Sequence, residues 1–266
     1  MPKSPDKIPR DVDEQVFWFG PTPQNPYARD PIDVISRLIE LHATKCKEVS
    51  YLEIGVDEGE TFDKVGASIK HGVDPYGGST SITHRMTSQL FFAMNNYFFR
   101  NLYNVIFIDG CHMCDIIIQE VQSAANSLNP GGHIVLHDTA PVKESAQLVL
   151  QEDYDSYIRE VVSVPSKERL TFRENTQKNG WIGYNGDAWK VVAILRATTP
   201  WGIISIPEAC CTIISPQPVE DLEHQKILLP LLQKGFAWED YVKNFDAILN
   251  PIDYATFEKE LYFNAP

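Results

Sequence analysis

Four acidic residues between positions 53 and 138 lie at or beside the ends of short apolar runs. They are Glu53, Asp74, Asp109 and Asp138. Short apolar runs bounded by turn residues are typical of buried strands. The carboxyl ends of parallel strands share one edge of a sheet, and ligands bind beyond that edge. We therefore expect these four carboxylates to converge on one binding site.

Two histidines accompany the last two of these acids. His137 directly precedes Asp138, and His112 follows Asp109 by three residues. Carboxylate oxygens suit a hard cation such as Mg²⁺, so Asp109 and Asp138 could share one, with His137 as a third ligand. Because imidazole titrates near neutrality, His112 is the preferred general base. Each histidine also has a structural alternative, since His112 could simply bond a helix terminus and His137 could simply pack.

A glycine turn follows the first apolar run. Gly55 ends a strand expected over 49–54, Gly59 follows four residues later, and Thr61 begins a helix expected over 61–70. A strand that turns at glycines into a helix is typical of a nucleotide pocket, because glycine lets the backbone approach a ligand. The alternative is an ordinary loop, since two glycines at this spacing also occur by chance.

Asp74 stands at the end of the second expected strand. It lies 21 residues after Glu53, which is the spacing at which an acid in a nucleotide-binding unit meets ribose hydroxyls. A carboxylate suits that role because it accepts hydrogen bonds from two neighbouring hydroxyls. An ordinary turn through Asp74-Pro-Tyr-Gly-Gly78 remains the competing interpretation.

Strands alternate with helices along the chain, which predicts an α/β fold with a doubly wound, mostly parallel sheet of Rossmann-like type. Further strands are expected at 71–74, 104–109, 132–138, 202–206 and 211–214. The last two must pair antiparallel, because their connection is short. Helices are expected over 30–42, 88–98, 112–128, 219–233 and 237–248. Two more are expected to begin at Asp187 and at Pro251. The aromatic stripe of the 88–98 helix, which includes Tyr97 and Phe98, is expected in the core.

The chain divides into three expected parts. Residues 1–29 form an irregular lead-in that packs on the domain or covers its active-site edge. Residues 30–215 form the main domain, with 141–185 as an insertion on the substrate side. Residues 216–266 form a helical C-terminal extension that either closes the core or makes a dimer contact.

The charge and apolar content of the chain argue against nucleic acid and membranes as partners. The 266-residue chain carries a formal net charge of −13, which argues against nucleic acid or a membrane as partner, because phosphate groups attract clustered Lys and Arg. No apolar run approaches the roughly 20 residues that span a bilayer. The first residues lack the apolar core of a signal peptide, so a cytoplasmic protein is expected.

The cysteines permit two interpretations. An odd number, five, makes a disulfide framework improbable. Cys111, Cys114, Cys210 and Cys211 could form a four-thiolate zinc site, but the last two lack the spacer that such sites favour. Buried small hydrophobic residues are the expected outcome.

The motifs resemble those of class I S-adenosylmethionine-dependent methyltransferases. Glu53-x-Gly55-x-x-x-Gly59-x-Thr61 is similar to the first motif of that superfamily, which holds the methionine end of the cofactor, and Asp74 matches its ribose-binding acid. Three segments resemble one branch, the small-molecule and sugar O-methyltransferases related to macrocin O-methyltransferase. They are Phe107–His112, Leu128–Gly132 and Val135–Asp138.

Two further segments, Met86–Phe92 and Gly186–Lys190, resemble parts of uncharacterised bacterial members. The resemblance covers residues 50–140 well and 180–215 loosely. It departs from the fuller pattern at Asp57, where a middle glycine is usual. It departs again at His137-Asp138, where metal-binding relatives often carry two adjacent carboxylates.

The resemblance implies S-adenosyl-L-methionine as cofactor, Mg²⁺ as a candidate metal and a hydroxylated small molecule, such as a sugar, as acceptor. The implied cofactor-binding residues are Glu53, Gly55, Gly59, Thr61, Asp74, Ser88 and Asp109. The implied catalytic residues are Asp109, His112 and His137, and the metal ligands are Asp109, His137 and Asp138. A homo-oligomer formed through the C-terminal helices is also expected.

Two other functions remain open at this stage. One is a metal-independent methyltransferase of the same fold that acts on nitrogen. The other is a non-catalytic module that binds the cofactor or a sugar and uses its acidic helical tail for assembly. An oxidoreductase is disfavoured, because the Gly-x-Gly-x-x-Gly of a dinucleotide site is absent from the sequence.

Overall fold

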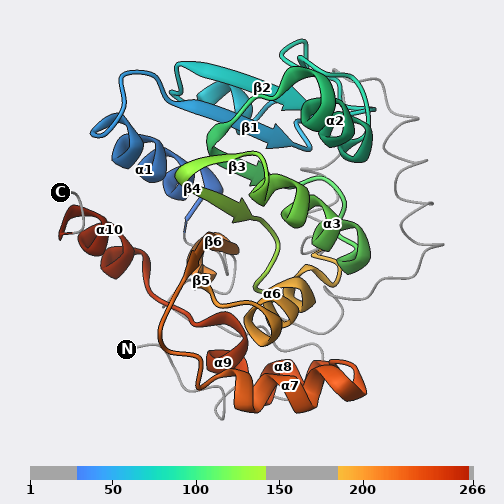
Figure 1. Ribbon diagram of the computed structural model, residues 1–266, viewed down its shortest axis with the longest axis vertical. Coiled ribbons are helices and arrows are strands. Elements are labelled where there is room, and N and C mark those ends of the chain that lie inside the picture. Colours follow the sequence, from blue (N-terminus) through green and yellow to red (C-terminus); the bar gives the residue numbers. More distant parts are fainter. Residues whose placement is uncertain (1–28, 142–184, 264–266) are drawn as a thin grey trace, which may run out of the picture.

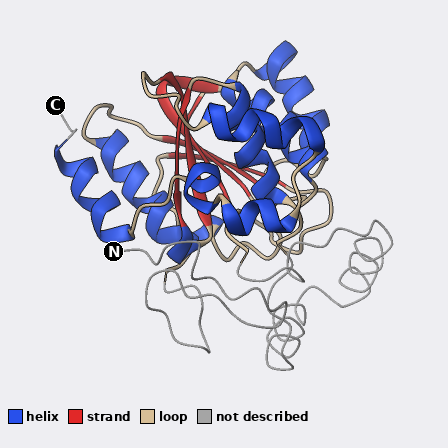
Figure 2. Cartoon of the chain, turned by 90° about the horizontal axis from the view of Figure 1, so that it is seen from below, coloured by secondary structure: helices blue, strands red, loops and turns tan. Residues whose placement is uncertain are grey.

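The computed structural model describes residues 29–141 and 185–263. Within these ranges a six-stranded sheet has the strand order β2-β1-β3-β4-β6-β5, and helices cover both of its faces (Figures 1 and 2). The strands are β1 (Ser50–Ile54), β2 (Ile69–Val73), β3 (Tyr103–Ile108), β4 (Leu128–Leu136), β5 (Trp201–Ile206) and β6 (Cys211–Pro218).

The sheet is mostly parallel. Strands β1 to β4 pair parallel with one another, whereas β6 pairs antiparallel with both β4 and β5. The β5–β6 connection is the single 3₁₀ turn η5 (Pro207–Ala209), which is too short for a parallel crossover. The predicted fold class, including the antiparallel pair, is confirmed.

Helices pack on the sheet in two layers. On one face lie α2, α3 and α6 to α9, and on the other lie α1 and α10. Neighbouring residues of a strand supply opposite layers, as Ile106 and Phe107 of β3 do. The helices are α1 (Pro31–Ala43), α2 (Ser88–Met94), α3 (Cys114–Ala125), α6 (Ala188–Thr198), α7 (Gln225–Lys234), α8 (Trp238–Lys243), α9 (Phe245–Leu249) and α10 (Tyr254–Phe263).

Local signals set the start of α1 as predicted. Asp30 is the N-cap, and its side chain accepts a hydrogen bond from the backbone N–H of Ile32, while Pro31 occupies the first helical position. The helix then turns Val34, Ile35 and Leu38 toward the sheet, where all three are buried.

The predicted helix over 61–70 is wrong. Only a 3₁₀ turn, η2 (Phe62–Lys64), forms there, and Val65 is already extended. The carbonyl oxygen of Phe62, which would accept an intrahelical bond, instead accepts one from Lys70 Nζ at 2.7 Å. The chain therefore leaves the turn early and enters β2 at Ile69.

The aromatic segment 88–98 was expected to form one helix packed in the core, and only its first part does so. Phe91 and Phe92 are buried, but Tyr97 and Phe98 are 76% and 77% exposed. A π-helical turn, η3 (Asn95–Phe99), follows α2, and its wider turn rotates the later aromatics away from the face that Phe91 occupies. The expectation of a continuous buried stripe is therefore corrected.

The C-terminal helices pack into the same core as the sheet. Tyr241 of α8 and Phe245 of α9 are buried, and the Tyr241 ring lies 4.9 Å from that of Trp189 in α6. The 237–248 helix divides at Asn244, and the last helix begins at Tyr254 rather than Pro251.

The late start of α10 has a local cause. Asn250 adopts the left-handed conformation (φ 48°), and the 250–252 segment bonds to the edge of β5 through the backbone of Ser205. The lead-in over 1–28 and most of the 141–185 insertion lie outside the described residues. Over the described ranges, every helix is too short or too polar to cross a bilayer.

Candidate active site

The carboxyl ends of β1 to β4 share one edge, as predicted. Register places Ile54 level with both Val73 and Ile108, and Ile108 level with Leu136. Asp109 and His137 directly follow the ends of β3 and β4. Asp109, His137 and Asp138 thus lie at the edge that the sequence pattern predicted.

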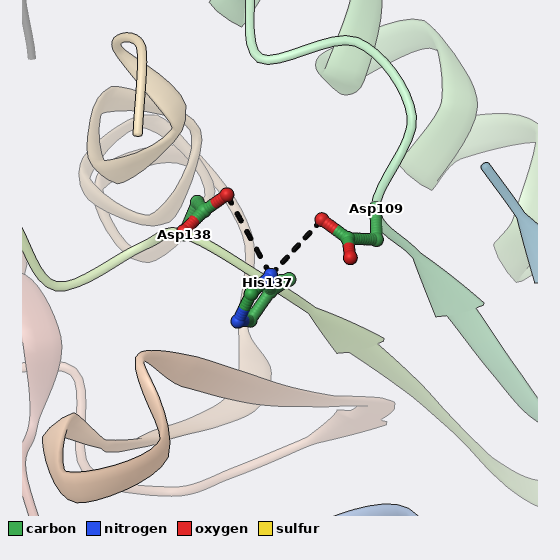
Figure 3. Close-up of side chains that lie close together, drawn as sticks. All are labelled: Asp109, His137 and Asp138. Atoms are coloured by element: carbon green, nitrogen blue, oxygen red, sulfur yellow. Dashed lines mark hydrogen bonds and ion pairs between the residues drawn. The ribbon is translucent and has the colours of Figure 1, made fainter. Parts of the chain in front are cut away.

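Asp109, His137 and Asp138 point toward one another at this edge, with the His137 ring between the two carboxylates (Figure 3). His137 Nδ1 lies 3.0 Å from Asp109 Oδ1 and 3.6 Å from Asp138 Oδ2. His112 joins them, because its Nε2 lies 3.2 Å from Asp138 Oδ2 and 3.5 Å from Asp109 Oδ1. Two histidines therefore bridge two carboxylates.

The charges in this cluster reinforce each other. Burial alone would lower the pKa of His137, but the adjoining Asp109 and Asp138 carboxylates outweigh it and raise the pKa to about 10. Burial likewise opposes ionisation of Asp109, yet His137 and His112 hold the pKa of that carboxyl well below its usual range. At neutral pH His137 therefore carries a proton. Because it is already protonated, it is poorly suited to act as a general base.

A segment far along the sequence holds the cluster in place, and it was not predicted as part of the site. Asn185 is buried, and its Nδ2 donates to Asp138 Oδ1 at 2.6 Å. Asp138 itself is left-handed (φ 58°), a conformation that Asp tolerates better than most residues. The amide of Asn185 thus fixes the direction of the Asp138 carboxylate.

Asp187, two residues further on, bonds to the segment of the chain that carries His112. The backbone N–H of Asp187 donates to the carbonyl of His112 at 3.1 Å. Asp187 Oδ1 accepts from the backbone N–H of Cys114 at 2.7 Å, so this carboxylate caps the start of α3 and makes no cap bond in its own helix, α6. Asp187 is thus the N-cap residue of α6, from which that helix was expected to begin, but its side chain caps α3 instead. We call Asn185, Gly186 and Asp187 the clamp.

The glycine turn after β1 packs directly against the cluster. Gly55 has φ +89°, and a Cβ there would lie 2.3 Å from the carbonyl oxygen of Asp109. Gly59 has φ +86°, and a Cβ there would meet Ser79 Oγ at 2.8 Å. Asp57, which replaces the usual middle glycine, is also left-handed (φ 47°). The turn therefore keeps its shape without that glycine.

Asp74 holds this turn from the neighbouring strand end. Its Oδ2 accepts from the N–H of Asp57 at 2.9 Å, and its Oδ1 accepts from the N–H groups of Tyr76 and Gly77 at 2.7 and 2.6 Å. Asp74 therefore stabilises the turn, and its binding of ribose stays a prediction. Thr61 precedes η2 without a side-chain cap bond.

Ser88 lies at the start of α2 and donates to Glu120 Oε1 of α3 at 2.5 Å. Both residues are buried. Burial raises the pKa of Glu120 to about 7, while the Ser88 hydrogen bond and His112 oppose that rise. Glu120 was not predicted as a functional residue from the sequence. The one sequence feature that could have indicated it is the position of an acidic residue on the inward face of a predicted helix.

Glu53 lies inside β1, 1% exposed, where it accepts a hydrogen bond from Tyr51 at 2.5 Å. Burial raises its pKa to about 8; the Tyr51 bond lowers the pKa and the Asp109 charge raises it further. The structure thus places Glu53 behind Asp109 as a carboxyl that is largely protonated at neutral pH.

The cysteines follow the hydrophobic interpretation. Cys210 and Cys211 are buried, and none of the five cysteines, all of which lie in the described ranges, forms a disulfide. Among the described residues, the group with metal-ligand spacing is Asp109, His137 and Asp138, without a thiolate.

Comparison with known proteins adds little. No protein-family model and no curated protein matches the chain. The chain is similar to an O-methyltransferase from Bacillus cereus in complex with SAH, at 10% identity and a TM-score of 0.38, over 68% of this chain and 80% of that one. It is also similar to the N-methyltransferase NodS from Bradyrhizobium japonicum WM9, at 12% identity and a TM-score of 0.35, over 70% and 98%.

A third similar structure is the MycE methyltransferase from the mycinamycin biosynthetic pathway, in complex with Mg, SAH and mycinamycin VI. The identity is 11% and the TM-score 0.36, over 72% of this chain and 55% of that one. At such identities and TM-scores, none of these proteins bears on the function of this chain.

The clamp gives a first prediction. A Cβ at Gly186, which has φ +56°, would lie 2.1 Å from the carbonyl oxygen of His112, whereas Gly131, at φ +75°, faces open space. Backbone strain should cost each alanine variant about 1–2 kcal/mol of unfolding free energy. Gly186→Ala should lose clearly more in urea denaturation and shift the His112 ring signals in NMR. Equal losses in the two variants would show that the clamp does not press on His112.

Glu53 gives a second prediction, on pH. Its folded pKa of about 8 exceeds the ordinary value of 4.5, so between these values unfolding releases a proton. Glu53 therefore makes stability fall as pH rises from 5 to 8, by up to about 1.4 kcal/mol per pH unit. Glu53→Gln, measured by urea denaturation across this range, should flatten the fall. Glu40→Gln, at a site 64% exposed, is the control and should change nothing, and an unchanged slope in Glu53→Gln would contradict the assignment.

Proposed function

We propose that this chain is an S-adenosylmethionine-dependent methyltransferase that methylates a hydroxyl of a small molecule such as a sugar, with Mg²⁺ assistance. One observation carries the proposal: the glycine turn after β1 packs against the backbone of Asp109, at the head of the Asp109–His137–Asp138 cluster. A turn that suits a nucleoside and a cluster that suits proton or metal chemistry thus adjoin at the carboxyl edge.

The cofactor would be held at the turn. Gly55 and Gly59 would let the backbone approach the methionine end, and Asp74 Oδ2, with one N–H donor in the structure, would take a ribose hydroxyl. Thr61 and Ser88 complete the proposed set of cofactor-binding residues. Glu53 would support this set from inside β1. Bound there, the cofactor supplies a methyl group on a positively charged sulfur. The acidic edge suits such a cation, because Asp109 is ionised.

Asp109, Asp138 and His137 would hold the metal. Their ligand atoms lie within 4.8 Å of one another, and two carboxylates suit Mg²⁺, while the imidazole suits transition metals better. The donor set therefore fits a divalent cation. A metal-binding imidazole must be neutral, so binding would displace the proton of His137.

The remaining residues would orient the acceptor and take its proton. Methyl transfer is an in-line displacement, so the protein contributes mainly by holding the acceptor oxygen near the methyl carbon. His112 would take up the hydroxyl proton. An imidazolium at His112 would lie against Asp138 and Asp109, and the clamp would keep it there.

A metal-independent reaction is the second candidate. The protonated His137 already balances Asp109 without a cation, and a nitrogen acceptor needs less activation than a hydroxyl. Chelation distinguishes the two candidates.

The cofactor half is tested by calorimetric titration with S-adenosylhomocysteine. Saturable binding at a stoichiometry of one is expected, because the turn and the acidic edge are preformed. Asp109→Asn should bind with similar affinity, since the turn meets the backbone of residue 109 rather than its side chain. A flat titration up to millimolar concentrations would reject the methyltransferase.

The metal half is tested by Mn²⁺ binding, followed by electron paramagnetic resonance. Asp109→Asn and Asp138→Asn should each weaken binding by at least about 10-fold, since even the loss of a group that only supports a ligand costs about 10–100-fold. Asp115→Asn is the control, because this exposed acid lies at the start of α3 but outside the cluster. Affinity should rise with pH as His137 loses its proton. Affinity that is equal in all variants, together with turnover that EDTA leaves unchanged, would favour the metal-independent candidate.

A further inference from the structure

A second site lies at the opposite edge of the sheet. A groove of about 420 Å³ is lined at this edge by His133 of β4, the first residues of β5, and the ends of α6 and α10. His133 lies in β4 four residues before His137, which directly follows the strand, so the backbones of these two residues are about 13 Å apart. The groove is therefore separate from the candidate active site.

The groove contains a buried cation, Arg196, at 7% exposure. Its Nε donates to the carbonyl of Ala247 at 2.8 Å and its Nη1 to the carbonyl of Ile203 at 3.1 Å. A guanidinium has five N–H donors. Within the part of the chain that the structure describes, those two bonds leave the others, Nη2 included, without a protein acceptor.

Arg196 also has no carboxylate within salt-bridge distance among residues 29–141 and 185–263. Burial lowers its pKa to about 10, and Asp221 partly opposes that effect, so the side chain is charged at neutral pH. Asp221 lines the groove but is exposed, so water weakens its pull. A buried charge is costly without an ionic partner, and Arg196 has two neutral carbonyls instead.

The walls around Arg196 combine apolar and polar groups. Trp201, Ile203 and Phe257 supply apolar surface. His224 Nε2 bonds the carbonyl of Arg196 at 3.0 Å, and Asn250 Nδ2 bonds that of Ile203 at 2.9 Å. Apolar walls with a few oriented polar groups, in a volume of this size, are typical of sites for small molecules.

We propose that this groove binds a small organic carboxylate, whose anionic group pairs with the Arg196 guanidinium and whose apolar body lies against Trp201 and Phe257. The planar donors of a guanidinium match a carboxylate in a bidentate pair, and the apolar surface of Trp201 and Phe257 favours an organic carboxylate over inorganic phosphate. The inference does not depend on methyl transfer.

The test compares benzoate with benzamide, which has the same shape but no charge, by NMR and calorimetric titration of the whole chain. Benzoate should bind at least about tenfold more tightly, since a charge-assisted pair is worth at least one such factor, and it should shift the Trp201 indole and His224 signals. Equal affinities, or benzoate shifts centred on His112 and His137, would overturn the proposal. Inorganic phosphate should bind more weakly than benzoate, and tighter phosphate binding would overturn the role of the apolar wall.

Two variants separate the contributions. Arg196→Gln should reduce the preference for benzoate over benzamide to about one. Val219→Trp, at a groove residue 40% exposed, should weaken both ligands by obstructing the groove while Arg196 is intact, so the test survives if Arg196→Gln fails to fold. Ile227→Ala, 47% exposed on α7 and outside the groove, is the control. Benzoate binding that is unchanged in Val219→Trp would place the ligand elsewhere.

Discussion

The parallel alignment of β1 to β4 is the constraint on which the site depends. It brings Asp109 and Asp138 to neighbouring positions at one edge, where two carboxylates repel each other unless cations intervene. The protonated His137 supplies the intervening charge, and His137 and His112 each lie within 3.6 Å of both carboxylates. The cluster is therefore stable only as a unit, and its charge balance is what a bound metal ion or a reacting proton would alter.

The clamp shows how the rest of the fold maintains that unit. Asp138, which follows β4, and Asn185, which precedes α6, are hydrogen-bonded although they are 47 residues apart in sequence. Asn185 and Asp187 at the start of α6 reach the two halves of the cluster, and Gly186 lets the backbone approach His112. The packing of α6 against α7 and α9 thus contributes directly to the geometry of Asp138 and His112.

The two edges of the sheet differ in how they treat buried charge. At the carboxyl edge, carboxylates and histidines neutralise each other within the cluster. At the opposite edge, Arg196 is held by carbonyl oxygens alone in the described part of the chain. Helix α6 runs between the two edges, from the clamp at its first residue to Arg196 near its last turn.

Apolar periodicity and connection length encode strands and their pairing, so the sheet, its antiparallel end and the edge that carries Asp109 and Asp138 could be predicted from the residues alone. The sequence also indicated Asp109, His137 and Asp138 as one group. It failed where a tertiary contact overrides a local pattern, as when Lys70 takes the Phe62 carbonyl and a π-turn exposes Tyr97 and Phe98. The clamp, the raised pKa of Glu53 and the groove at Arg196 arise from burial and from contacts between distant segments, which leave no mark on local spacing.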